Sequence, residues 1–409
     1  MNPRIYVLAL ATFTVGTEGY VIAGVLPAVA HSMNVSVSVG GQLVTVFALV
    51  YALAGPPLIG AFRRVPPKSV LIGAMLAFAL SNALAACAPD YAVLAAARVL
   101  AALSAALLAG PAAAAAAALC RPQDMPKAIA VTASGNALAL TLGAPIGTLI
   151  GGLLGWRGTF LFVTVLALTT ALMLAVLLPA VPAAPVGTGR AELLRSPAVR
   201  WSLLTTFGVF LAAYCTYTYL APIAERATGM GSRGVAALMI VFGAGAFLAG
   251  RTIGRILVEV PLAQVLRVAL LLMALLLGTI AVGTAWHPHI AAEIAAFPVL
   301  FCLGAAWCCG GVSQQARIAA LAPSQRSLAL GLHFSVQFLG VAIGGAVGGL
   351  ALSTGGPVAV PALSALIACV ALLSVQRTVP VTAGSPDRVA PAVISAQEEQ
   401  RIGPESYSG

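Results

Sequence analysis

The stretch GAPIGTLIGGL, residues 143–153, recurs with its glycines in register as GVAIGGAVGGL, residues 340–350, at an offset of 197 positions. A second pair of segments repeats at an offset of 195. In each, a glycine (Gly55 or Gly250) is followed by Val-Pro and then Val-Leu, within 65–71 and 260–266. Two matches at nearly the same offset indicate an internal duplication rather than chance similarity. The chain is therefore predicted to consist of two related halves.

The composition places both halves in a membrane. Hydrophobic residues make up 60% of the 409 and charged residues only 8%, with a mean hydropathy of +1.02. A soluble domain carries about 25% charged residues, so this chain could not cover a surface that faces water. A helix needs about 20 apolar residues to cross a bilayer. We expect an all-α membrane protein with twelve spans, near 5–29, 39–62, 69–88, 92–119, 127–152, 157–179, 201–222, 234–257, 262–284, 290–313, 328–352 and 357–375.

These spans divide the chain into four regions. Residues 1–179 form an N-terminal half of six helices, and residues 201–376 form a C-terminal half of six. Between them, 180–200 is rich in Pro and Gly and then basic, which predicts a linker. The tail 377–409 is polar and lacks hydrophobic periodicity, so we expect it to be disordered.

The basic residues predict the orientation. With the N-terminus in the cytoplasm, seventeen of the 21 Lys and Arg fall on the cytoplasmic side and three (Arg157, Arg226, Arg233) on the other, with Arg98 inside a span. Cytoplasmic loops of membrane proteins carry this excess of positive charge. We expect a multi-pass protein of the bacterial cytoplasmic membrane with both termini inside. The net charge of +10 therefore reflects topology, and no nucleic-acid partner is expected.

Glu18 is the only acid near the middle of a predicted span. An ionised carboxylate there costs about 2.5–3.5 kcal/mol on insertion scales, so it should face the bundle interior. Arg98 lies about two turns into the fourth span and must find a carboxylate, carbonyls or water. We interpret Glu18 as a proton-exchanging group and Arg98 as its electrostatic partner. The alternatives are a neutral Glu18 bonded to Thr14 or a neighbouring helix, and an Arg98 that reaches the membrane surface or braces backbone carbonyls.

The fifth span carries almost no side chain on one face. Gly143, Gly147 and Gly151 recur every four residues, a spacing that lets two helix backbones approach closely. Pro145 removes a backbone donor and predicts a kink. Either tight packing alone or a hinge between conformations fits this pattern.

The second half offers a candidate wall for a substrate cavity. Phe210, Tyr214 and Tyr217 lie on one stripe of the seventh span, and a lipid-facing or packing stripe is the alternative. In the eleventh span, His333 and Gln337 lie one turn apart and are expected to point inward. His333 could relay protons or form a packing hydrogen bond.

Other chemistry is not indicated. The seven cysteines show no metal-ligand spacing, so no metal is expected. The sequence has no phosphate-binding G-x4-G-K-[ST] loop, no H-E-x-x-H and no G-x-S-x-G, which argues against ATP drive and against an enzyme. We expect no cofactor.

Taken together, these segments resemble the major facilitator superfamily, in particular the bacterial twelve-helix drug:H+ antiporters of the arabinose-efflux-like and chloramphenicol-resistance branch. VGTEGYVIAGVLPAVAHSMNVS (15–36) is similar to the first helix of that branch, with Glu18 in the place of its membrane acid. RVLAALSAALLAG (98–110) is similar to its fourth-helix motif, which begins with Arg, and 143–152 is similar to its antiporter motif. WRGTF (156–160) also fits. The resemblance covers about 375 residues.

One loop departs from the family pattern G-x-x-x-D-R-x-G-R-R. The segment that begins at Gly55 keeps Arg63, Arg64 and Lys68 but lacks the Asp. In the family this acid contributes to a cytoplasmic charge clamp, so the clamp is not expected in the usual form here.

The resemblance implies proton-coupled efflux of a small amphiphilic compound, such as the antibiotic chloramphenicol, by alternating access in a monomer. Its partners would be the solute, protons and the lipid bilayer. Efflux of a sugar, nucleoside or other metabolite is the alternative, which Gln42, Asn82, Asn136 and Gln337 keep open. A membrane scaffold or sensor without transport is an alternative of another class.

Overall fold

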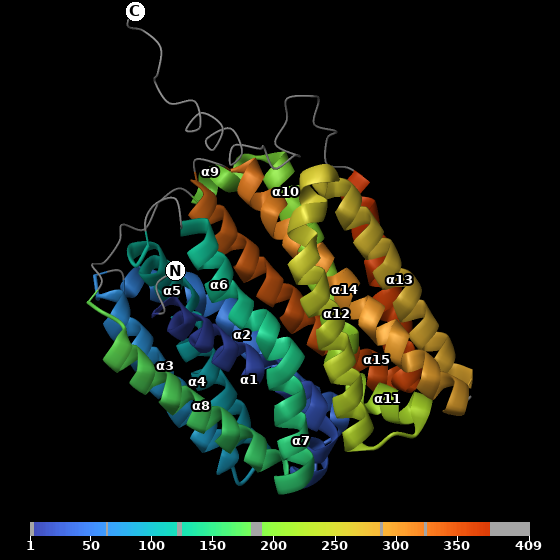
Figure 1. The fold of residues 1–409 in the computed structure, drawn as a ribbon. Coiled ribbons are helices and arrows are strands. Elements are labelled where there is room, and N and C mark those ends of the chain that lie inside the picture. The colour runs from blue at the N-terminus through green and yellow to red at the C-terminus, as the bar shows by residue number, and fades with distance from the viewer. Residues whose placement is uncertain are drawn as a thin grey trace, which may run out of the picture.

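The computed structural model describes residues 4–62, 64–120, 125–180, 190–286, 289–322 and 325–376. Within these ranges all regular elements are helices (Figure 1). They are α1 (Arg4–Ser32), α2 (Val37–Ala61), α3 (Pro67–Ala86), α4 (Tyr91–Ala106), α5 (Ala109–Ala118), α6 (Met125–Leu138), the π-helical turn η2 (Ala139–Gly143), α7 (Ala144–Leu154), α8 (Trp156–Leu177), α9 (Arg190–Arg195), α10 (Pro197–Tyr217), α11 (Leu220–Thr228), α12 (Ser232–Glu259), α13 (Leu262–Trp286), α14 (His289–Leu321) and α15 (Arg326–Gln376). The predicted tail and nine residues of the predicted linker, 181–189, lie outside the described residues.

Eleven stretches of the described chain are long and apolar enough to cross a membrane. The last, within α15, is long enough for two spans. A straight helix of its 51 residues would be about 76 Å long, more than twice the hydrocarbon thickness of a bilayer. Gly356 breaks it with φ +69° and ψ −171°, a backbone conformation that is essentially confined to glycine, and Pro357 follows. The prediction of an all-α membrane protein is confirmed, and with the break at Gly356 the described stretches are consistent with twelve spans.

The fifth span is interrupted as the proline predicts. Pro145 has no N–H to donate to the carbonyl one turn before it. The chain adapts over the preceding turn, η2, where the N–H of Ala144 donates to the carbonyl of Ala139 in the i→i+5 pattern of a π-helix. The disturbance therefore lies just before the proline. Such π-turns are frequent at functional sites.

The glycine face of α7 and η2 lies directly against α1. A Cβ placed on Gly143 would overlap Thr17, and one on Gly147 would overlap Val21. At Gly151 the nearest atom, Cγ1 of Val25, would be only 2.5 Å away. The four-residue spacing on one helix thus matches the four-residue spacing on the other, as close helix packing requires.

The repeated glycines of the second half pack in the corresponding way. Gly340, Gly344 and Gly348 of α15 lie against backbone atoms of α10, the first helix of that half. A Cβ on Gly344, for example, would lie 2.9 Å from the carbonyl oxygen of Leu211. In both halves the fifth span therefore packs on the first, and the sequence repeat corresponds to a structural repeat.

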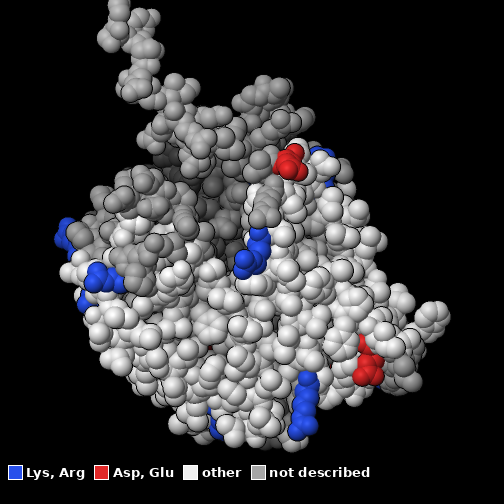
Figure 2. All heavy atoms as spheres, in the orientation of Figure 1, with Lys and Arg blue, Asp and Glu red and all other residues white. Residues whose placement is uncertain are grey.

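The two halves lie side by side, with α1–α8 in one and α10–α15 in the other (Figure 1). They meet closely near the end of the bundle away from the N-terminus. There the hydroxyl of Thr141 donates to the carbonyl of Gly243 at 2.8 Å, and Gly41 of α2 touches the ring of Tyr219. At the end near the N-terminus the surface is hollowed between the halves (Figure 2).

Candidate functional site

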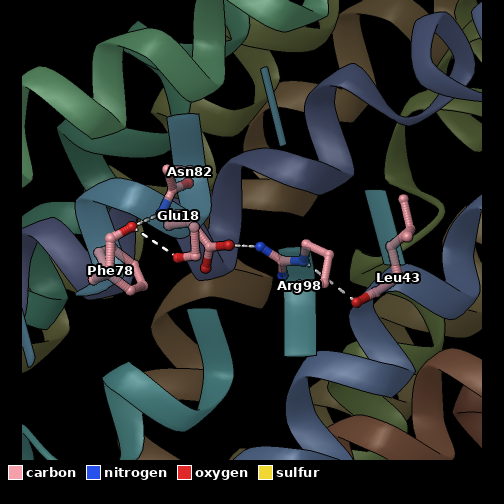
Figure 3. A network of polar contacts seen from close by, with 6 residues as sticks. Glu18, Leu43, Phe78, Asn82 and Arg98 are labelled. Carbon is pink, nitrogen blue, oxygen red and sulfur yellow. Dashed lines mark hydrogen bonds and ion pairs between the residues drawn. The ribbon is translucent and has the colours of Figure 1, made fainter. Parts of the chain in front are cut away.

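Glu18 and Arg98 form an ion pair inside the first half (Figure 3). Glu18 lies midway along α1 and Arg98 lies on α4, and each side chain is only 1% exposed. Of the residues that the structure describes, Arg98 is the only partner of the Glu18 carboxylate, since neither of its oxygens accepts a further hydrogen bond. The sequence predicted this pairing.

The helix α2 provides the other contacts of Arg98. Its Nε donates to the carbonyl of Leu43 at 3.5 Å, and its guanidinium carbon lies 4.4 Å from the centre of the Phe47 ring. A cation over an aromatic face is attracted by the ring quadrupole. Arg98 is thus held by a carboxylate on one helix and by a carbonyl and a ring on another.

The neighbouring side chains of Thr14 and Asn82 donate hydrogen bonds to groups other than Glu18. The hydroxyl of Thr14 donates to the carbonyl of Leu10 at 2.8 Å and lies 3.0 Å from the hydroxyl of Thr170. Asn82 donates to the carbonyl of Phe78 at 2.9 Å (Figure 3). Since Thr14 bonds to other groups, the alternative of a Glu18 bonded to Thr14 finds no support.

A buried pair of this kind has a large effect when one partner changes. Removing one member leaves an uncompensated charge, at a cost of about 3–5 kcal/mol. Protonation of Glu18 is such a change, because it removes the negative charge that faces Arg98. A change in the charge of either residue would therefore alter the forces within the first half.

An aromatic cluster occupies the contact between the two halves, with Trp307 of α14 at its centre. Ring centroids lie 5.3–6.4 Å from that of Trp307, and most of the pairs are edge-on or tilted, arrangements that aromatic rings favour. The surrounding rings are those of Tyr20, Phe210, Tyr214, Tyr217 and Phe242. Tyr20, from α1, is the member contributed by the first half. The structure thus brings together the three predicted aromatics and adds Trp307, Tyr20 and Phe242, which the sequence analysis did not single out.

Polar groups join this cluster. Asn136, an exposed residue of α6, donates to the hydroxyl of Tyr20 at 2.9 Å. The hydroxyl of Tyr217 donates to the backbone carbonyl of Tyr20 at 3.4 Å. On the other side, Tyr217, Phe242 and Trp307 line a small cavity within the second half, whose remaining lining is apolar apart from Thr216. The cluster therefore combines aromatic faces with a few hydrogen-bonding groups and contains no charged side chain.

His333 and Gln337 lie apart from the ion pair. His333 is buried within the second half, where its Nδ1 lies 3.1 Å from the hydroxyl of Thr206. Gln337, one turn further along α15, is half-buried. Close by, the Gln314 amide donates to the Ser202 hydroxyl at 3.0 Å. His333 thus belongs to a hydrogen-bonded network of the second half, and its part in a proton relay stays a prediction.

The loop motif is only partly described. Gly55 is buried within α2, six residues before the end of that helix. Arg64 is exposed, Lys68 is half-buried in the first turn of α3, and Arg63 lies outside the described residues. These residues are not brought into contact with the ion pair by any described interaction.

Comparison with known proteins identifies the family. The family model described as Major Facilitator Superfamily matches residues 8–324, which include the ion pair, the glycine face of the fifth span and the aromatic cluster. The chain belongs to the Major Facilitator Superfamily.

Curated relatives agree with this assignment. Over 272 residues this major facilitator protein is 35% identical to a chloramphenicol resistance protein of Streptomyces lividans, a match that covers 65% of this chain and 69% of the relative. It is also 29% identical over 386 residues to the MFS-type transporter YbcL of Bacillus subtilis, covering 92% and 96% of the two chains. The family is one of transporters rather than of enzymes.

Solved structures share the fold. A D-xylose-proton symporter superposes with a TM-score of 0.75 at 16% identity, over 92% of this chain and 97% of the symporter. A bacterial homologue of the lysosomal transporter Spinster, in an inward-facing and unoccupied conformation, gives a TM-score of 0.67 at 18% identity, over 94% and 100%. At these identities the likeness concerns the fold.

Proposed function

We propose that this major facilitator protein exports a small amphiphilic organic compound, with chloramphenicol as the first candidate, in exchange for protons. The observation that carries the proposal is the buried ion pair between Glu18 and Arg98. Burying a carboxylate in a span with a single cationic partner costs free energy. Ionisable residues at such positions mark proton and ion pathways in transporters.

The exchange follows from the two charge states of the pair. When Glu18 is ionised, it binds Arg98 and the first half contains no uncompensated charge at this position. When Glu18 takes up a proton from the outer side, Arg98 loses its counter-charge and the packing around it must change. Alternating access requires two arrangements whose relative populations a ligand can shift, and the proton acts here as that ligand.

The substrate class rests on two supports. The cluster around Trp307 offers aromatic faces, and the Tyr20–Asn136 pair offers hydrogen-bonding groups, a combination suited to an uncharged aromatic solute. The relative from Streptomyces lividans carries chloramphenicol resistance in its name. Both favour a drug-like compound over a sugar, although the exposed amide of Asn136 would also suit a more polar solute.

We propose the orientation that the charge distribution predicts, with both termini in the bacterial cytoplasm and the protein acting as a monomer. In this orientation the hollow between the halves in Figure 2 opens to the cytoplasm, from which an exporter takes its substrate.

Inverted membrane vesicles that contain the protein test the proposal. With an imposed pH gradient, acidic inside, they should accumulate labelled chloramphenicol, and adding the drug should accelerate decay of the gradient. Drug accumulation without proton movement would contradict the coupling. Proton movement driven by a sugar or nucleoside but not by chloramphenicol would change the substrate class. Failure of every solute would favour a scaffold or sensor.

A further inference from the structure

One face of α2 connects the ion pair to the second half. Leu43, Phe47 and Tyr51 are spaced by four residues and therefore lie on the same face of the helix. The first two contact Arg98, through the Leu43 carbonyl at 3.5 Å and the Phe47 ring at 4.4 Å. Figure 3 shows Arg98 extended between Glu18 and Leu43.

The third residue of this face contacts the other half. The ring of Tyr51 stacks on that of Phe338 of α15, with centroids 3.8 Å apart and ring planes inclined by 25°. Phe47 and Tyr51 also face each other, at 6.3 Å and 30°. A continuous series of contacts therefore runs from Glu18 through Arg98, Phe47 and Tyr51 to Phe338.

The rest of the α2–α15 contact is closely packed. Gly345 lies against Thr45, and Gly349 lies against Gln42 and the carbonyl of Ser38. With glycines on one side of the contact there is little side-chain slack, so a shift of α2 relative to α4 is transmitted to α15 rather than absorbed.

The charge state of Glu18 changes the forces on Phe47. While the carboxylate is ionised, it competes with the ring for the guanidinium. After protonation the cation remains buried, and the Phe47 face and the Leu43 carbonyl are its remaining described partners. A desolvated cation–π contact is stronger than an exposed one, so Arg98 is then drawn toward α2.

We propose that Phe47 is a positioning residue for coupling. By holding Arg98 against α2, its ring links the protonation of Glu18 to the Tyr51–Phe338 contact between the halves. This inference rests on the proposed proton role of Glu18, and the experiment below separates the two.

Hydrogen–deuterium exchange of the full-length protein gives a readout that needs no substrate. Peptides from α2 and α15 are compared at about pH 6 and about pH 8, after correction for the intrinsic pH dependence of exchange. The variants are Phe47→Leu, which keeps an apolar side chain but removes the ring, and Phe47→Tyr, which retains the ring face. Phe160→Leu on α8 is the matched control, because it removes a similarly buried ring whose described ring contact is with Trp156 and not with Arg98.

We expect the wild type, Phe47→Tyr and Phe160→Leu to change protection by about fivefold between the two pH values, and Phe47→Leu to lose this response. Chloramphenicol export by Phe47→Leu should lose its dependence on the pH gradient at the same time. A full pH response in Phe47→Leu, equal losses in the Leu and Tyr variants, or no response in the wild type would each overturn the inference.

Glu18→Gln should also lose the response. If it keeps the response, the proton role of Glu18 fails. If Glu18→Gln loses the pH response but Phe47→Leu keeps it, the proton role of Glu18 stands and the link through Phe47 fails.

Discussion

Replacing Gly147 by alanine tests whether the contact between α7 and α1 matters for transport. A Cβ at this position would overlap Cγ2 of Val21 on α1 and would lie 3.5 Å from Cγ2 of Thr159 on α8. The carbonyl of Gly147 also accepts from the Thr159 hydroxyl at 2.8 Å, so α7 cannot easily move away from α1. The new methyl group must therefore push the two helices apart.

The magnitude follows from known costs of overpacking. Extra methylene-sized groups in a packed interior cost about 1–3 kcal/mol, and the better helix propensity of alanine returns up to about 1 kcal/mol. Glu18 lies less than one turn before Val21 on α1, so a displaced α1 also disturbs the ion pair. We expect export to fall about threefold to tenfold, a factor of ten corresponding to about 1.4 kcal/mol. Gly147→Leu should cause a larger loss while membrane insertion is largely retained.

The assay is drug export from vesicles, normalised to the amount of inserted protein, with two further variants. Gly147→Ala combined with Val21→Ala removes the overlapping methyl groups and should recover most of the lost export, since contacting residues couple in double-mutant cycles. Gly73→Ala on the exposed face of α3 is the control, because a Cβ there meets no other atom within 4 Å. Wild-type export by Gly147→Leu, or no recovery in the double variant, would refute the packing argument.

Three further predictions can be checked directly. Trp307→Leu should raise the KM for chloramphenicol export about tenfold with little change in protein level, because five aromatic partners lose their common neighbour; an unchanged KM would remove the cluster from the binding wall. Gly356→Ala should lower the free energy of unfolding by about 1–3 kcal/mol in thermal melts, since alanine does not tolerate this φ and ψ. The control is Gly278→Ala within the helix α13, which should leave the thermal stability unchanged or raise it. Equal melting temperatures for the two variants would contradict the conclusion that the backbone conformation at Gly356 requires glycine. Of two reporter enzymes fused after residue 200, one that works only in the cytoplasm should be active and one that works only in the periplasm should be inactive. Activity of the periplasmic reporter would overturn the proposed orientation.

Much of the fold could be predicted because its signals are local in the sequence. The predicted spans follow from the runs of apolar residues along the chain. The close helix contacts follow from the four-residue spacing of the glycines. The Glu18–Arg98 pair could also be predicted, because a carboxylate and a guanidinium buried in spans of the same half have few other ways to be satisfied.

The rest depends on tertiary contacts that leave no local signal. Trp307 is the only tryptophan of α14, and its partners come from three other helices, so no periodicity marks it as the centre of a cluster. The contact of Arg98 with Phe47 depends on how α2 lies against α4, which the sequence does not specify. Pro145 predicted a disturbed helix, but the place where the chain absorbs it, η2, depends on the packing of that turn.

Export and binding by Glu18→Gln test the central claim most directly. Glutamine keeps the size and hydrogen-bonding capacity of the side chain but cannot exchange a proton. Chloramphenicol binding at equilibrium should stay within about twofold of the wild type, while export against a concentration gradient under an imposed pH gradient should be lost. Glu18→Asp, whose carboxylate is drawn back by one methylene, should keep part of the activity. Uphill export by Glu18→Gln at the wild-type rate would contradict the account.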